Sequence, residues 1–285
     1  MAGQCKAIIE SRDVSFCYSG DLEPSPALSG INLTIKQGEY VALIGPNGSG
    51  KTTLLKLFNA LLIPSNGEVL VKGISTSEEE QLPEVRRSCG MIFQNPDNQL
   101  VATTVEEDLA FGLENLALPA KVIRERVKAT AALLGLEHLL TQPPHLLSGG
   151  EKQRVAIGGV LAMEPDCILM DEPTAMLDPA GRQGVLDTVH SLNRNRDLAV
   201  IHVTHFPEEA ALADRIVALN EGRIIADGAA KSILSDLDLL HKIGLQGTTA
   251  GELAALLRSS GCPLPSHILK NRELVDHICT LAQNN

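Results

Sequence analysis

The chain has 285 residues, with 24 lysine and arginine against 35 aspartate and glutamate residues, which gives a net charge of −11. This length suits one large domain or two modest ones. The acidic balance argues against broad, nonspecific attraction to DNA, RNA or an anionic bilayer, so we expect no nucleic-acid partner. No apolar run approaches the ~18 residues of a membrane-spanning helix, and the N-terminus lacks the pattern of a signal peptide. The sequence therefore predicts a cytosolic chain.

Three predicted strands lead into a glycine-rich loop. Residues 7–18 alternate loosely between apolar and polar, residues 31–35 alternate strictly, and residues 40–44 form an apolar run typical of a buried strand. Residues 45–52, Gly-Pro-Asn-Gly-Ser-Gly-Lys-Thr, then fit the phosphate-loop pattern G-x-x-x-x-G-K-[ST] at every fixed position.

This loop predicts a binding site for nucleotide phosphates. Its glycines let successive N–H groups point inward around an anion, and the N-terminus of the following helix adds positive charge. Lys51 would reach the phosphates and Thr52 would ligate Mg²⁺, whereas a plain turn would need neither. Tyr18 could stack on adenine or pack in the core, and spacing alone does not choose between these. The predicted loop site comprises Gly45, Pro46, Asn47, Gly48, Ser49, Gly50, Lys51, Thr52 and Thr53.

The next part of the chain predicts a helical subdomain inserted into an α/β core. After strands at 68–72 and 88–93, the polar run 93–99 is a loop or hinge candidate. Thr104 and Glu107 then form a capping box, and Pro119 fits a first helical position. The three expected helices span residues 104–116, 119–135 and 149–163.

The third of these helices opens with Leu-Ser-Gly-Gly-Glu at residues 147–151. Ser148 and Glu151 match a capping box. Two glycines at a helix start are unfavourable, costing roughly 1 kcal/mol each relative to alanine in a helix interior, and they would expose N–H groups to an anion. The same residues can therefore cap the helix and bind an anion.

Polar residues follow two further predicted strands. Asp171 and Glu172 come directly after the apolar run 167–170, at the strand end where open α/β sheets bind ligands. Two adjacent acids could be a solvated strand end, but beside a phosphate loop Asp171 is expected to coordinate Mg²⁺ and Glu172 to activate water. His205 follows a strand at 198–203; a lone histidine is more often structural than catalytic.

The remaining sequence predicts a closing hairpin at residues 216–226 and a small appended helical domain. The composition shifts from residue 229 on, where linkers with glycine, threonine and proline separate the helical patterns. The expected helices span residues 232–243, 250–258 and 272–282.

The order of these motifs resembles the ATP-binding subunits of ABC transporters. The resemblance covers residues 7–230 and rests on the phosphate loop, Gln94, residues 147–151, Asp171-Glu172, Leu177-Asp178 and His205. It implies an α/β P-loop NTPase (ABC ATPase) core with an N-terminal antiparallel β-subdomain. It also implies an inserted helical subdomain at about residues 95–163 and a C-terminal helical extension at residues 231–285.

The resemblance also implies roles for the motif residues in binding and hydrolysing ATP with Mg²⁺. Glu172 corresponds to the general base and His205 to the switch histidine, with Lys51 and Gln94 completing the catalytic set. Thr52, Asp171 and Gln94 correspond to the metal site. Tyr18 corresponds to the aromatic residue that stacks on adenine. Residues of one chain that would close over the γ-phosphate held by another are Ser148, Gly149, Gly150 and Glu151.

A closer resemblance is to the ATPases of energy-coupling factor (ECF, cobalt-type) importers of vitamins and metal ions. It rests on residues 93–100, 155–165 and 176–179 and on tail segments such as 243–245. It implies a second ABC ATPase subunit in a homo- or heterodimer, a transmembrane coupling protein and a small membrane substrate-binding subunit. It also implies a peripheral location on the cytoplasmic side of the cell membrane. Two departures are Glu151, where glutamine is commoner, and the link 246–249, which lacks proline.

Three other functions remain as alternatives at this point. The chain could be the ATPase of another ABC importer or of an exporter, although its tail argues against this. It could be an ABC-type ATPase acting on DNA or the ribosome, but such proteins typically carry two ATPase units, a long coiled-coil insert or a basic surface. A non-hydrolysing nucleotide sensor is disfavoured by the presence of Glu172 and His205.

Overall fold

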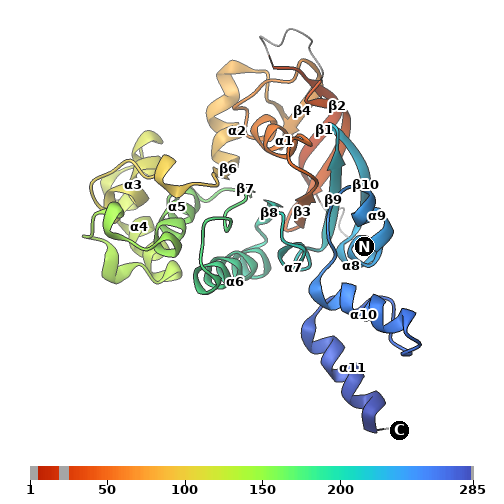
Figure 1. Ribbon diagram of the computed structural model, residues 1–285. Helices are drawn as coiled ribbons and strands as arrows, with labels where there is room; N and C mark the ends of the chain where they lie inside the picture. Colours follow the sequence, from red (N-terminus) through yellow and green to blue (C-terminus); the bar gives the residue numbers. More distant parts are fainter. Residues whose placement is uncertain (1–5, 19–25, 284–285) are drawn as a thin grey trace, which may run out of the picture.

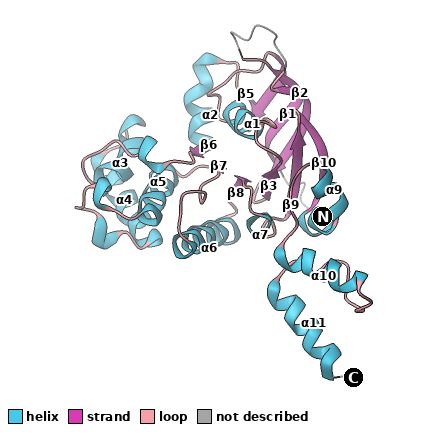
Figure 2. Ribbon diagram, viewed as in Figure 1, coloured by secondary structure: helices cyan, strands magenta, loops and turns pink. Residues whose placement is uncertain are grey.

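The computed structural model describes residues 6–18 and 26–283, whose strands form two sheets (Figures 1 and 2). The smaller sheet is antiparallel with the order β2-β1-β4-β5, as expected for an N-terminal antiparallel β-subdomain. The larger sheet has the order β10-β9-β3-β8-β7-β6. The strands are β1 (Ala7–Phe16), β2 (Leu28–Lys36), β3 (Tyr40–Ile44), β4 (Asn66–Val71), β5 (Ile74–Ser75), β6 (Cys89–Ile92), β7 (Cys167–Asp171), β8 (Ala199–Val203), β9 (Arg215–Asn220) and β10 (Arg223–Ala229).

Five strands of the larger sheet run parallel, and only β10 pairs antiparallel, with β9. Strands β3, β7 and β8 are buried at every residue. Their continuous apolar character is what a parallel strand needs when both faces of the sheet are covered. Because parallel strands end at one edge, the segments that follow β3, β6, β7 and β8 lie together there.

Most of the helices expected from the sequence are present in the structure. The capping box of Thr104 and Glu107 at the start of α3 is present. Pro119 is the N-cap of α4 and lies just outside the helix, whereas the sequence pattern placed it at the first helical position. The helices are α1 (Lys51–Phe58), α2 (Leu82–Ser88), α3 (Val105–Asn115), α4 (Ala120–Leu134), α5 (Gly149–Ala162), α6 (Pro179–Arg196), α7 (Pro207–Ala210), α8 (Ala230–Ser235), α9 (Leu237–Lys242), α10 (Thr249–Ser259) and α11 (Asn271–Gln283).

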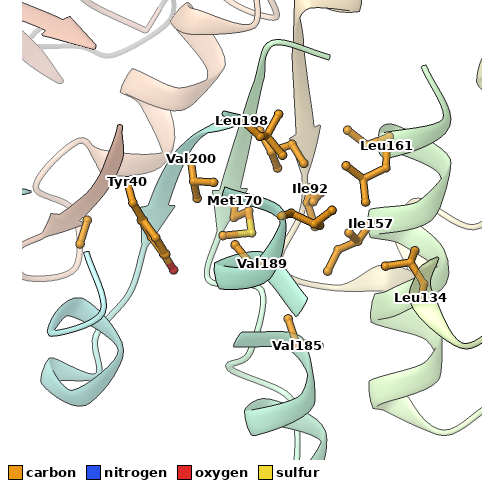
Figure 3. Close-up of a cluster of buried hydrophobic side chains, with 14 of the residues drawn as sticks. Tyr40, Ile92, Leu134, Ile157, Leu161, Met170, Val185, Val189, Leu198 and Val200 are labelled. Atoms are coloured by element: carbon orange, nitrogen blue, oxygen red, sulfur yellow. The ribbon is translucent and has the colours of Figure 1, made fainter. Parts of the chain in front are cut away.

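Helices α3, α4 and α5 form a layer beside β6 and β7 that shares its core with the sheet (Figures 1 and 3). Figure 3 shows Leu134 of α4 and Ile157 of α5 beside Ile92 and Met170 of the sheet and Val185 of α6. All belong to one continuous cluster of buried apolar side chains. The inserted helices therefore pack against the strands that carry the predicted site, and α5 and α6 make this connection.

Three helices, α2, α6 and the short α7, were not predicted. Helix α6 has recognisable sequence signals, since Asp178 is its N-cap and Pro179 its first residue, and Val185, Val189 and Leu192 are buried at helical spacing. The expected helix at 232–243 is wrong as one element. It is interrupted at Asp236, whose side chain accepts a hydrogen bond from Leu239 N (2.9 Å) and so caps α9 instead of continuing α8.

The end of the described chain is helical and has its own small core. Ala250 and Ala254 of α10 pack with Ile268 and with Leu274 of α11. Figure 1 shows these two helices extending away from the larger sheet. The division into residues 7–230 and 231–285, and the subdomain bounds 95–163, stay predictions. Among the helices of the described ranges, none is both long and apolar enough to span a bilayer.

Candidate active site

The predicted site residues converge at the carboxyl edge of the larger sheet. Strand β8 lies between β3 and β7, and Val203 at its end is in register with both Leu43 and Asp171. The phosphate loop follows β3, Glu172 follows β7 and His205 follows β8. Strand order thus brings together three motifs that are more than 30 residues apart in the chain.

The phosphate loop is held open by its backbone and by Lys51. Gly45, Gly48 and Gly50 have φ of 151°, 78° and 101°, a region that favours glycine. A Cβ on Gly45 would lie 2.1 Å from the carbonyl oxygen of Leu219, whereas one on Gly48 would meet no atom within 4 Å. Lys51 Nζ donates to the carbonyl oxygens of Gly45 (2.8 Å) and Pro46 (2.9 Å). The loop is therefore closed against β9 and open on the side of Gly48.

Two polar groups in this loop fit an anionic ligand. Lys51 is only 5% exposed, and this burial lowers the pKa of its ammonium group, although the nearby carboxylates of Glu172 and Asp171 oppose the shift. Ser49 Oγ is buried without a hydrogen-bond partner in the described structure. A buried cation and an unpaired hydroxyl are both satisfied when phosphate oxygens occupy the loop.

The expected Mg²⁺ residues Thr52 and Asp171 touch each other. Thr52 Oγ1 donates to Asp171 Oδ1 at 3.0 Å. Asp171 is buried, and burial raises the pKa of its carboxyl group, while the hydrogen bond from Thr52 opposes this shift. A hydroxyl and a carboxylate are the oxygen ligands that Mg²⁺ prefers, so the pair fits that ion. Gln94, the third residue of the expected metal set, makes its hydrogen bond elsewhere.

The expected catalytic residues Glu172, His205 and Gln94 contact one another. His205 Nε2 lies 2.5 Å from Glu172 Oε1, and Gln94 Nε2 donates to Glu172 Oε2 at 3.4 Å. Glu172 has a left-handed backbone (φ 49°), and its N–H donates to Val203 O of β8. Non-glycine residues in this region are strained by about 1–3 kcal/mol and concentrate at functional sites. One carboxylate is thus held from both sides at the end of β7.

Tyr18 lies beside the first turn of α1. Its hydroxyl is hydrogen-bonded to Thr53 Oγ1 (2.9 Å), and its ring meets Phe16 edge-on at 4.9 Å. The side chain is 44% exposed, so it is not a core tyrosine. Stacking of this ring on adenine stays a prediction.

The residues 148–151 cap α5 as expected. Ser148 donates to Glu151 Oε2 from its hydroxyl (2.6 Å) and from its backbone N–H (2.8 Å), and these hydrogen bonds lower the pKa of Glu151. A Cβ on Gly150 would lie 3.1 Å from the Cα of Gly181 in α6. Among the described residues, no hydrogen bond joins Ser148, Gly149, Gly150 or Glu151 to the phosphate loop. Figure 1 shows β6 and β7 between α5 and α1.

Two side-chain hydrogen bonds connect the loop between β6 and α3 to α5. Lys152 Nζ donates to Asp97 Oδ1 (2.8 Å), and Gln99 Nε2 donates to Ala156 O (3.4 Å). The ion pair with Lys152 neutralises part of the charge of Asp97.

A family model described as ABC transporter matches residues 28–175. The chain belongs to the ABC transporter family. The matched segment runs from β2 through the phosphate loop to just beyond Glu172, so it includes every strand of the site except β8. The predicted P-loop NTPase fold and ATPase class are confirmed, and nucleotide binding comes with this family.

Curated relatives extend the similarity of this ABC ATPase over nearly its whole length. One from Caldanaerobacter subterraneus, named energy-coupling factor transporter ATP-binding protein EcfA1, is 48% identical over 273 residues, covering 95% of this chain and 99% of the relative. A protein of the same name from Symbiobacterium thermophilum is 49% identical over 278 residues, covering 96% of this chain and 97% of the relative. These relatives confirm the energy-coupling factor type that the motifs and the tail predicted.

Solved structures of similar proteins have the same architecture. CbiO1 from Clostridium perfringens, described as part of the ABC transporter complex cbiONQ, has a TM-score of 0.75 and is 37% identical in sequence. The matched region covers 84% of this chain and 94% of the CbiO1 chain. The ATP-binding cassette MJ0796, a dimer in a post-hydrolysis state bound to ADP and phosphate, has a TM-score of 0.71 and 32% identity. The matched region covers 78% of this chain and 98% of the MJ0796 chain.

Glu209 and its neighbours form a buried polar cluster that the sequence analysis missed. Glu209 is 2% exposed, yet it stands next to the exposed Glu208 in a polar stretch after β8. Sequence offers no signal that separates the two glutamates, because the difference arises from the direction in which the short helix α7 packs.

Proposed function

We propose that this ABC ATPase hydrolyses ATP with Mg²⁺ as the energy-coupling subunit of an ECF importer for a vitamin or a transition-metal ion. The observation that carries the hydrolytic part is the contact of Glu172 with His205 beside the phosphate loop. The near full-length similarity to ECF transporter ATP-binding proteins supports the transport part.

Hydrolysis requires positioning and charge stabilisation more than covalent chemistry by the protein. Lys51 and the loop N–H groups bind the phosphates, and Thr52 and Asp171 hold Mg²⁺. The metal ion, when bound, neutralises negative charge on the phosphate oxygens. Glu172 orients and deprotonates the attacking water, since its carboxylate lies at the strand end next to the loop. His205 holds Glu172 by the 2.5 Å contact, and it would reach the γ-phosphate from there.

We further propose that the site is completed by a second ATPase subunit, identical or related. Ser148, Gly149, Gly150 and Glu151 lie at the start of α5 and make no hydrogen bond to the phosphate loop of their own chain within the described structure. The glycine N–H groups at this helix N-terminus suit the γ-phosphate held by the other subunit. The dimeric, ADP-bound MJ0796 cassette supports this arrangement. ATP binding would then close the dimer, and hydrolysis would open it.

The proposed membrane partners are inferred from the type of transporter, an ECF importer. We propose that a transmembrane coupling protein contacts the loop that carries Gln94 and Asp97, which joins the sheet to the helical layer and is fastened to α5. A small membrane subunit would bind the substrate. The ATPase would then lie peripherally on the cytoplasmic side of the cell membrane, without nucleic acid as a partner.

Affinity co-purification from detergent-solubilised membranes of the native host, with mass spectrometry of the bound proteins, tests this proposal. We expect a second ATPase or a second copy of this chain, one transmembrane coupling protein and at least one small membrane protein. Recovery of an exporter-like permease, or of nucleic-acid machinery without a membrane protein, would refute the transport assignment and leave the ATPase chemistry standing.

A further inference from the structure

A buried carboxylate joins the two segments that carry the catalytic pair. Glu209 Oε1 accepts a hydrogen bond from Thr174 Oγ1 (2.6 Å), and Glu209 Oε2 accepts one from Thr204 Oγ1 (2.5 Å). Thr174 lies two residues after Glu172, and Thr204 directly precedes His205. Both hydroxyls are almost fully buried. Each oxygen of one side chain thus holds one of the loops in which the reacting groups lie.

The hydroxyl of Thr204 also fixes the peptide that contains His205. It accepts a hydrogen bond from Phe206 N (3.0 Å) and donates one to Glu209. The hydroxyl therefore links the residue before His205 to the residue after it. In this way one hydroxyl holds the backbone on both sides of His205. On the other side, the N–H of Glu172 is bound to β8.

Two basic side chains lie near the carboxylate of Glu209. His202 Nε2 lies 3.4 Å from Oε2, and the other ring nitrogen, Nδ1, is hydrogen-bonded to the hydroxyl of Tyr40 (3.1 Å). Arg182 Nε lies 3.7 Å from Oε1, and its guanidinium stacks over the ring of Phe206, 3.8 Å from the centroid. Arg182 belongs to α6, so the same carboxylate connects the catalytic loops to that helix.

A buried polar cluster of this kind is energetically unfavourable compared with an apolar core. Removing a carboxylate from water is unfavourable, and well-packed apolar residues of similar volume often serve stability as well or better. Its members are drawn from β3, β8, α6, α7 and the segments after β7 and β8. Most of them contact the Glu209 carboxylate, which accepts a hydrogen bond from one hydroxyl in each catalytic loop, and this favours a role in geometry over one in stability.

We propose that Glu209 is a positioning residue for the reaction, which sets the distance between Glu172 and His205 through the hydroxyls of Thr174 and Thr204. The inference rests on the proposed roles of Glu172 and His205. Through Arg182 the carboxylate also holds these loops to α6, whose N-terminal Gly181 lies against Gly150. Movement of α5 or α6 on dimer closure is thereby transmitted to the catalytic pair.

Thr204→Val is the primary test, because it removes one hydroxyl and keeps the side-chain volume. The variants are assayed as the full chain in its purified complex, with ATP turnover measured against ATP concentration. We expect kcat to fall by at least about tenfold, since displacing catalytic groups by about 1 Å can cost ~10²-fold, and KM for ATP to stay unchanged because the phosphate loop is intact. Thr204→Ser keeps the hydroxyl and should restore most of the activity.

Thr76→Val is the matched control. Thr76 is fully buried, and its hydroxyl has no hydrogen-bond partner in the described structure. Its replacement removes a buried hydroxyl at a distance from the catalytic loops, so kcat should stay at the wild-type value. If Thr204→Val does not fold, as judged by circular dichroism and elution volume, Thr174→Val tests the other hydroxyl in the same assay.

A double variant separates positioning from general destabilisation. In the His205→Ala background, Thr204→Val should cause no further loss of kcat, because residues that act as one unit have non-additive effects. Wild-type turnover by Thr204→Val, or an equal loss with and without His205, would overturn the proposal. Wild-type turnover by His205→Ala would instead refute the proposed role of His205, so the two failures can be told apart.

Discussion

Glu172→Gln should abolish turnover while preserving ATP binding. Glutamine has nearly the shape of glutamate, so the contacts with His205 and Gln94 retain their partners and the left-handed backbone is not further strained. The amide cannot accept a proton at neutral pH. The substitution therefore removes proton transfer and leaves Lys51, Thr52 and the rest of the phosphate loop unchanged.

The size of the effect follows from the role of a general base. Such a base contributes about 10²–10⁴ to the rate, or roughly 3–5 kcal/mol of barrier height. Glu172 raises the pKa of Lys51 through its charge, so its neutralisation lowers that pKa slightly. Bound phosphate supplies a stronger negative charge at the same place, and we therefore expect little change in ATP affinity.

The assay compares single-turnover ATP hydrolysis with equilibrium binding of a fluorescent ATP analogue. Glu164→Gln is the matched control, because Glu164 also has a left-handed backbone (φ 56°) and an acidic side chain, but it is exposed and paired with Arg126. The control should hydrolyse ATP at the wild-type rate. Turnover by Glu172→Gln within a fewfold of wild type would contradict the assignment of Glu172 as base.

Three further predictions follow from the geometry. Gly45→Ala should lower the thermal midpoint and ATP affinity more than Gly73→Ala, since both have positive φ but only Gly45 would place a Cβ against a carbonyl oxygen. Burial raises the pKa of Glu209, but hydrogen bonds and the charge of His202 outweigh it and hold that pKa below its ordinary value. Glu209→Gln should therefore lose about 1–3 kcal/mol in denaturant unfolding at neutral pH, a deficit that shrinks as pH falls through the lowered pKa. Asp97→Arg, which sets a second cation beside Lys152, should uncouple transport by the reconstituted complex and spare ATP hydrolysis by the isolated dimer; unchanged transport would reject that contact.

Local sequence patterns predicted the backbone of the phosphate loop and the helix caps because each of these is defined by its own residues. The phosphate loop needs glycine where φ is positive and lysine and threonine at fixed offsets, and these requirements are visible in residues 45–52. The same holds for the capping box of Ser148 and Glu151, whose two partners are three residues apart. The interruption at Asp236 was missed because a helical pattern of apolar residues continues across it, and only the capping geometry stops the helix.

The buried environment of Glu209 could not be predicted in this way. Its partners Thr174, Thr204, His202 and Arg182 are scattered over more than 30 residues and belong to different elements. Glu208 and Glu209 have identical chemistry, and only the packing of α7 on the sheet buries one and exposes the other. A sequence fragment carries no information on which of two adjacent side chains faces the core when the helix has only one turn.

The sequence by itself determined the fold family and the phosphate-loop motif, and it predicted the catalytic residues, because short-range backbone and chemical requirements define these motifs. Only the tertiary structure decided that Glu172, His205 and Gln94 touch, that Thr52 meets Asp171, and that residues 148–151 belong to a different layer from the phosphate loop. These relations depend on the order and register of parallel strands. That order is set by long-range pairing and by burial of both sheet faces, which no local pattern records.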